Sequence, residues 1–242
     1  MGFLCKKEEK IRQILTLFLL DMIFYPIIVL FLPLAFLSLL PIIGYVAGHI
    51  EMYQWLFYGM GGYFIVSRLP FIRKNIEWMQ TFSHELTHTI VGLLFFHKIY
   101  SFKAEQGTGM ITHAGRRFGG IFIDLSPYCL PIFTYILLLF RLMGDPSMMY
   151  LFDIFTGITL AFHISCFWKQ TGLYQTDIQG QGYVRAFMFI IAGWIFNTSI
   201  VLLSIPNGIG KAFSTLFIQY WDRLQEWWQW LLQFIRYIIQ LF

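Results

Sequence analysis

The chain has 242 residues, of which 57% are hydrophobic, 20% are aromatic and only 12% are charged. This composition excludes an ordinary soluble domain, in which about a quarter of the residues are charged, and indicates an integral membrane protein. The formal net charge of +4 comes from basic residues at the edges of apolar stretches, which is typical of membrane anchoring, so we expect a lipid bilayer and no nucleic acid as partner.

Apolar stretches of membrane-spanning length recur along the chain. About 20 apolar residues in a helix cross the roughly 30 Å hydrocarbon core of a bilayer. By that measure the sequence predicts about six transmembrane helices, at residues 14–46, 52–66, 76–96, 119–142, 148–168 and 183–205. The first is overlong, and we expect its three prolines, at positions 26, 33 and 41, to kink or tilt it. We therefore expect an all-α membrane protein with one polytopic domain over residues 1–210.

The third predicted span carries the motif His84-Glu85-Leu86-Thr87-His88. Residues four apart share one face of a helix, so His84 and His88 can both reach one zinc ion. Glu85 lies between them in sequence and is the candidate general base that activates a water. Ionisable side chains at membrane depth are costly and are functional candidates by default, which favours a catalytic or binding role for this motif.

Residues 97–117 connect the third and fourth predicted spans. Apolar and polar residues alternate on both sides of a glycine-bearing segment, which predicts a short membrane-associated β-hairpin turning at residues 107–109. Because main-chain hydrogen bonds need no side-chain match, a strand edge here is a candidate binding site for an extended substrate. The candidate substrate-binding residues are Gly107, Thr108, Gly109 and Met110. A plain solvated loop is the alternative interpretation.

A catalytic zinc usually holds three protein ligands, so His84 and His88 require one more. Four residues qualify by their chemistry: Asp177 near the start of the sixth span, Asp153 and His163 in the fifth, and His113 in the predicted hairpin. Each also has a purely structural interpretation, such as a helix cap for Asp177, a helix-terminal charge for Asp153 or a buried hydrogen-bonded side chain for His163. Asp177 is the favoured ligand, and the others remain open.

The C-terminal residues 211–242 form a second predicted unit. Aromatic and aliphatic residues recur there at helical spacing, with charged residues and glutamines between them. Tryptophans are abundant in this segment, and they prefer the boundary between membrane and water. The segment therefore predicts an amphipathic helix lying in the membrane interface, with a partner-binding helix as the alternative.

The sequence resembles the site-2 protease family of intramembrane zinc metalloproteases over residues 76–203. The resemblance rests on the stretch from Ser83 to Thr89, on the glycine-bearing hairpin, on Leu125-Ser126-Pro127 and on a distant aspartate before another span. It implies that zinc is bound by His84, His88 and a distant aspartate, which maps best to Asp177, with Glu85 as base. The family's usual Leu-Asp-Gly and Asn-x-x-Pro patterns are absent from this chain.

Together these features predict a multi-pass enzyme of a bacterial cytoplasmic membrane that hydrolyses peptide bonds of membrane proteins or peptides. Two other functions use the same residues. One is a non-catalytic zinc-binding membrane protein with a transport or assembly role. The other is a membrane metalloenzyme that acts on lipid-modified substrates. Neither the substrate's identity nor the oligomeric state follows from the sequence.

Overall fold

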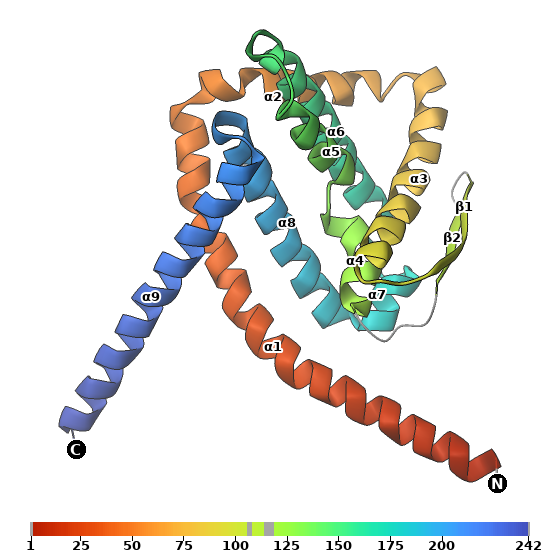
Figure 1. The fold of residues 1–242 in the computed structure, drawn as a ribbon, viewed down its shortest axis with the longest axis vertical. Coiled ribbons are helices and arrows are strands. Elements are labelled where there is room, and N and C mark those ends of the chain that lie inside the picture. Colours follow the sequence, from red (N-terminus) through yellow and green to blue (C-terminus); the bar gives the residue numbers. More distant parts are fainter. Residues whose placement is uncertain (1, 106–107, 114–118, 242) are drawn as a thin grey trace.

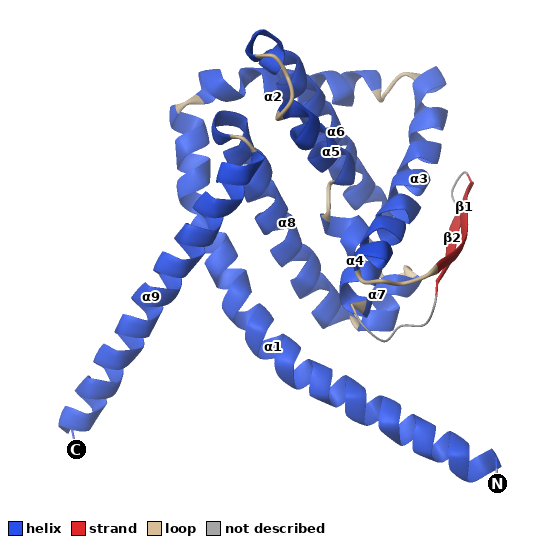
Figure 2. Ribbon diagram, viewed as in Figure 1, coloured by secondary structure: helices blue, strands red, loops and turns tan. Residues whose placement is uncertain are grey.

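The computed structural model describes residues 2–105, 108–113 and 119–241 (Figure 1). Most of these residues are helical, and two short strands form the remaining regular structure (Figure 2). In chain order the elements are α1 (Gly2–Gly48), α2 (Ile50–Val66), α3 (Pro70–Leu94), β1 (Ile99–Glu105), β2 (Thr108–His113), α4 (Gly120–Cys129), α5 (Ile132–Arg141), the 3-10 helix η1 (Pro146–Met148), α6 (Met149–Gln170), α7 (Thr176–Gln181), α8 (Tyr183–Asn207) and α9 (Ile209–Leu241).

Three helical stretches in the described part of the chain are long and apolar enough to cross a membrane: Met22–Gly48, Pro146–Gln170 and Tyr183–Asn207. The number becomes four if α4 and α5, which meet at 78°, form one broken span. The other two predicted spans correspond to α2, which has only 17 residues, and α3, which carries charged residues along its first half. The long apolar helices indicate a membrane protein, and the total of six spans stays a prediction.

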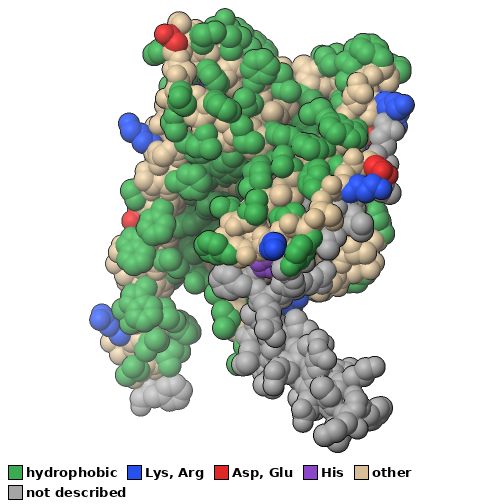
Figure 3. Space-filling model, turned by 45° about the vertical axis from the view of Figure 1, so that its right-hand side comes forward, with side chains coloured by type: hydrophobic (Ala, Val, Ile, Leu, Met, Phe, Trp, Pro, Cys, Tyr) green, Lys and Arg blue, Asp and Glu red, His purple; other side chains and the backbone are tan. Residues whose placement is uncertain are grey.

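Apolar side chains cover much of the outer surface, as expected for a chain in contact with lipid. Figure 3 shows hydrophobic side chains spread over most of the visible face, with charged side chains scattered among them. Helix α1 contains Pro26, Pro33 and Pro41 and changes direction along its length (Figure 1). Each proline removes one backbone hydrogen bond and obstructs the preceding turn, which accounts for the bending.

Helices α2 and α6 pack closely through two glycines. A Cβ atom added to Gly157 would lie 2.0 Å from the carbonyl oxygen of Leu56, and one added to Gly59 would lie 2.0 Å from that of Ile154. Such contacts are possible only without a side chain, and small residues at helix crossings are common in membrane proteins. Helix α6, held in this way, makes polar contacts with α3: Gln80 donates to Ser165, and Lys169 donates to Glu77.

The predicted fourth span is divided into two helices. Helix α4 ends at Cys129 and α5 begins at Ile132, so the last carbonyls of α4 have no partner within the helix. Side chains of α8 replace those partners. Trp194 donates its indole N–H to the carbonyl of Tyr128 at 2.7 Å, and Asn197 donates to the carbonyl of Cys129 at 3.0 Å. These bonds make a break tolerable in an apolar setting, where an unpaired carbonyl is costly.

Strands β1 and β2 pair antiparallel and pack against α3. Phe102 of β1 contacts Phe82 of α3 edge to face, with ring centroids 5.7 Å apart. Among the predicted substrate-binding residues, Gly107 lies outside the described residues. The others belong to β2, where Thr108 pairs with Glu105, Gly109 with Ala104 and Met110 with Lys103.

The C-terminal segment forms the long helix α9. Its first turns are packed against α1 and α8, with Ala212 and Leu216 fully buried. Beyond Tyr220 the helix extends away from the bundle, and its aromatic and aliphatic side chains are largely exposed (Figure 1). Exposed apolar side chains along this length are consistent with the predicted interfacial helix.

The α2–α6 crossing gives a direct stability test. Gly157→Ala places a methyl group on the Leu56 carbonyl and should destabilise the protein by about 1–3 kcal/mol through overpacking. Gly61→Ala is the matched control, because a Cβ atom at Gly61 meets no atom within 4 Å. It should be neutral or stabilising by up to about 1 kcal/mol. Thermal unfolding in detergent micelles measures the difference, and equal transition temperatures for the two variants would contradict the packing argument.

Candidate metal centre

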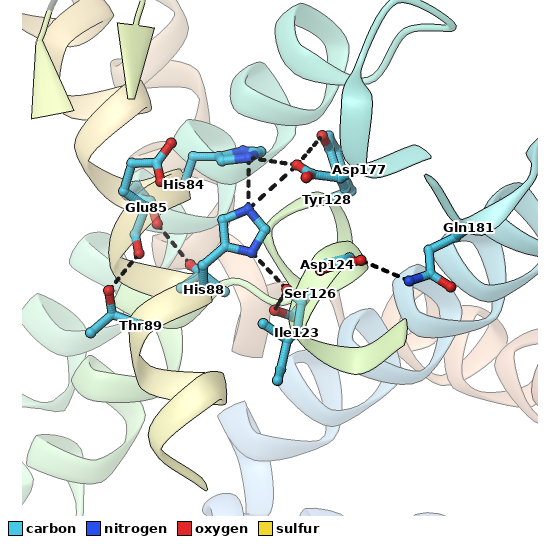
Figure 4. A network of polar contacts seen from close by, with 12 residues as sticks. His84, Glu85, His88, Thr89, Ile123, Asp124, Ser126, Tyr128, Asp177 and Gln181 are labelled. Atoms are coloured by element: carbon cyan, nitrogen blue, oxygen red, sulfur yellow. Dashed lines mark hydrogen bonds and ion pairs between the residues drawn. The ribbon is translucent and has the colours of Figure 1, made fainter. Parts of the chain in front are cut away.

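His84 and His88 face the same side of α3, as their spacing predicts. Their Nε2 atoms are 3.1 Å apart, and their rings meet edge to face (Figure 4). Both imidazoles are largely buried, with side-chain exposures of 10% and 12%. One turn of helix therefore presents two nitrogen donors to the same small volume.

Asp177, on α7, completes a group of three. Its Oδ2 atom lies 3.6 Å from Nε2 of His84 and 3.5 Å from Nε2 of His88. These are the residues that form a group able to hold a metal ion within the described part of the chain. The structure thus brings together the two motif histidines and the aspartate that the sequence favours.

The distances between the three donor atoms fit a tetrahedral zinc site. With Zn–N and Zn–O bonds of about 2.0–2.1 Å, tetrahedral geometry separates the ligand atoms by about 3.4 Å. The observed separations of 3.1, 3.5 and 3.6 Å lie on both sides of that value. Two imidazole nitrogens and one carboxylate oxygen are also a donor set found in catalytic zinc sites, which leave a fourth position open.

The ring of His88 is oriented by the backbone of α4. Its Nδ1 lies 2.7 Å from the carbonyl oxygen of Ile123. A carbonyl only accepts hydrogen bonds, so Nδ1 carries the proton and Nε2 is directed toward the other two donors. Nδ1 of His84 is buried and has no comparable backbone partner among the described residues. A backbone carbonyl therefore orients one of the two histidines.

Asp177 stays ionised in this setting. Burial acts to raise the pKa of its carboxyl group, but the hydrogen bonds and charges of His84 and His88 outweigh burial and hold the pKa well below its usual range. A carboxylate must be deprotonated to bind a metal ion, so the site supplies the required form.

The short helix α7, which carries Asp177, is attached to its neighbours by polar contacts one turn further on. Gln181 donates from Nε2 to Oδ2 of the buried Asp124 on α4 at 2.7 Å. Arg185 of α8 donates to the carbonyl of Gln181 at 2.6 Å and to its side-chain oxygen at 3.1 Å. Residues 177 and 181 share a face of the helix, so this contact also limits rotation of α7 about its axis.

A side-chain hydrogen bond holds α3 to α6 one turn before His84. Gln80 donates to the hydroxyl of Ser165 on α6 at 3.0 Å, and that hydroxyl is 2.7 Å from the hydroxyl of Tyr63 on α2. Glu85 is buried beside the two histidines and lies within electrostatic reach of His88 and Asp177. The candidate base therefore belongs to the same buried region as the three donors.

Two of the other candidate ligands, Asp153 and His163, make contacts elsewhere. Asp153 forms an ion pair with Arg141, whose Nε is 3.0 Å from its Oδ1. His163 stacks on Trp194, with ring centroids 5.0 Å apart and planes inclined by 23°. His113 ends strand β2, in register with Ile99. Neither Asp153 nor His163 joins the group formed by His84, His88 and Asp177, and the side chain of His113 lies outside the described part of the chain.

Sequence reasoning missed three residues that border the group. Tyr128 donates its hydroxyl to Oδ2 of Asp177 at 3.3 Å, and Asp124 and Gln181 attach α7 to α4. Tyr128 directly follows the Ser126-Pro127 pair in an apolar stretch, where a tyrosine usually indicates core packing. Gln181 lies four residues after Asp177, a spacing that places both on one face of the short helix α7.

Comparison with known proteins gives no match: no protein-family model, no curated protein and no solved structure is similar to this chain. The chemistry of the site itself therefore has to indicate the function. Its parts are three metal-binding donors at the right separation, one buried carboxylate next to them, and a membrane setting.

Metal analysis tests the site directly. We expect purified protein to bind one Zn²⁺ per chain, and His88→Ala or Asp177→Ala to weaken binding at least about 10-fold, since each removes one of three ligands. His49→Ala, at an exposed histidine, is the control and should leave the zinc content unchanged. Zinc retained by Asp177→Ala but lost in His163→Ala would refute this ligand set.

Proposed function

We propose that this protein is an intramembrane zinc metalloprotease, similar to the site-2 protease family, that cleaves membrane-associated proteins or peptides. The observation that supports it best is the meeting of His84 and His88 with Asp177 at separations that suit tetrahedral zinc. The adjacent Glu85 adds the one group that a hydrolase needs and a purely structural zinc site does not.

The residues present fit zinc, and each has a role. His84, His88 and Asp177 would hold the ion and leave one position for water or substrate. When bound, zinc supplies Lewis-acid polarisation of the scissile carbonyl and acidifies water at the site. The Ile123 carbonyl keeps His88 in the orientation that binding requires, because it fixes the proton on Nδ1.

Glu85 is the proposed proton carrier. Its carboxylate accepts a proton from the attacking water and then delivers that proton to the departing amine, so one group serves as base and then as acid. Burial of Glu85 shields this exchange from bulk solvent, which strengthens the electrostatic interaction between the carboxylate and its neighbours.

The membrane setting determines which substrates fit. In this proposal α2 and α3 also lie within the bilayer, which gives the six-span arrangement that the sequence predicts, and α9 lies in the interface. A helical substrate must unwind before cleavage, since a helix hides its peptide bonds behind its own hydrogen bonds. The paired strands β1 and β2, which pack on α3, would hold the unwound segment, with Gly107, Thr108, Gly109 and Met110 as proposed contacts.

Replacement of Glu85 by Gln separates catalysis from metal binding. We expect Glu85→Gln to lose peptide hydrolysis by about 10²–10⁴-fold, because general acid–base catalysis contributes that much, while its zinc content stays at the wild-type level. The measurement is mass spectrometry of single-span membrane peptides incubated with purified protein in detergent.

His49→Ala again serves as the control and should cleave at the wild-type rate. Cleavage retained by Glu85→Gln would exclude Glu85 as the base. Zinc-loaded wild type that cleaves no peptide would instead favour the non-catalytic zinc-binding alternative.

A further inference from the structure

We propose that Tyr128 is the positioning residue that holds the Asp177 carboxylate in place against His84 and His88. This inference rests on the metal centre of the proposed function and adds a residue to it. Tyr128 lies on α4, whereas the histidines belong to α3 and Asp177 to α7, so it connects the elements that build the site.

The carboxylate of Asp177 needs a further contact because its own short helix does little to fix its orientation. Helix α7 has six residues and ends at Gly182, whose φ is +80°. The contact between Gln181 and Asp124 fixes the far end of α7, but it leaves the two side-chain torsions of Asp177 free. A ligand from such an element retains rotational freedom unless another group restrains its carboxylate.

The hydroxyl of Tyr128 provides that restraint. It donates to Oδ2 of Asp177 at 3.3 Å, and Oδ2 is the same oxygen that lies nearest the Nε2 atoms of both histidines (Figure 4). The ring of Tyr128 also meets the ring of His84 edge to face, with centroids 5.2 Å apart. One side chain therefore contacts two of the three candidate ligands, one through its hydroxyl and one through its ring.

Tyr128 is itself firmly fixed. Its exposure is 1%, and its carbonyl accepts the Trp194 indole N–H at 2.7 Å, next to the break between α4 and α5. A rigid donor is what a positioning role requires, since a mobile one would transmit its own disorder to the carboxylate.

Other tyrosines of the chain show what an ordinary structural hydroxyl does. Tyr53 donates to the carbonyl of Leu202 at 3.1 Å, and Tyr135 donates to Oδ1 of Asn197 at 2.6 Å. Those bonds join helices and do not involve the metal-binding group. Tyr128 differs from them because its acceptor is a candidate ligand.

Tyr128→Phe tests the role of the hydroxyl, because it keeps the ring and its contact with His84 and removes only the hydrogen bond. We expect the zinc dissociation constant to rise about 10- to 100-fold, the usual cost of losing a group that orients a metal ligand. The zinc dissociation constant is measured by competition with a chromogenic chelator in detergent. The visible spectrum of the cobalt-substituted protein should also change, since it reports on ligand geometry.

Tyr53→Phe is the matched control. It removes a hydroxyl from a fully buried tyrosine that donates to the carbonyl of Leu202, and its zinc dissociation constant should stay within about 3-fold of wild type, because Tyr53 contacts no candidate ligand. Unfolding of the metal-free proteins should show a comparable stability loss for both variants. A difference in zinc affinity then reflects the position of the hydroxyl and not a general loosening.

The possible outcomes distinguish a failure of the positioning role of Tyr128 from a failure of the proposed zinc site. Equal zinc affinity in Tyr128→Phe and wild type would overturn the positioning role, and so would equal weakening in Tyr128→Phe and Tyr53→Phe. Wild type that binds no zinc would overturn the metal centre itself. If Tyr128→Phe does not fold, Trp194→Phe, which releases the Tyr128 carbonyl, is expected to weaken zinc binding, and unchanged affinity there would count against the role.

Discussion

Backbone carbonyls in an apolar environment must have partners, and the break between α4 and α5 satisfies this constraint through α8. Trp194 and Asn197 take the place of the missing helical donors at Tyr128 and Cys129. Because the break is stable, α4 can end beside α3 instead of continuing as a straight span. Its Ile123 carbonyl then reaches His88 and its Tyr128 hydroxyl reaches Asp177. The geometry of the site thus depends on how one interrupted helix is completed by another.

Buried charge is compensated locally in two separate places. At the site, one carboxylate faces two imidazoles. At the other end of the bundle, Asp153 pairs with Arg141, whose remaining N–H groups bond the carbonyls of Ser204 and Ile205 near the end of α8. Removing one partner from such a pair leaves an uncompensated charge, which costs several kcal/mol. Asp153 therefore has a structural role as the ion-pair partner of Arg141. This explains why an aspartate with suitable chemistry is not part of the metal-binding group.

The sequence predicts local geometry better than long-range contacts. The convergence of His84 and His88 follows from helical spacing alone, and the paired strands follow from alternation around a glycine-bearing turn. The choice of Asp177 over Asp153 depends on how α7 packs against α4. The spacing of residues along the chain does not predict this packing. The length rule counts α2 and α3 as spans from their apolar content. Helix α2 has only 17 residues and α3 carries charged residues along its first half, so the six-span total stays a prediction. Tyr128 was missed because an aromatic residue in an apolar run resembles core packing until its acceptor is known.

His88 and Asp177 are separated by 89 positions in the chain. During synthesis at about 5–20 residues per second, the second ligand follows the first by roughly 5 to 20 seconds. Until α7 emerges from the ribosome, the two imidazoles have no carboxylate to complete their set. An incompletely synthesised chain would thus carry the whole His-Glu-x-x-His sequence and yet lack the third donor of the candidate metal centre.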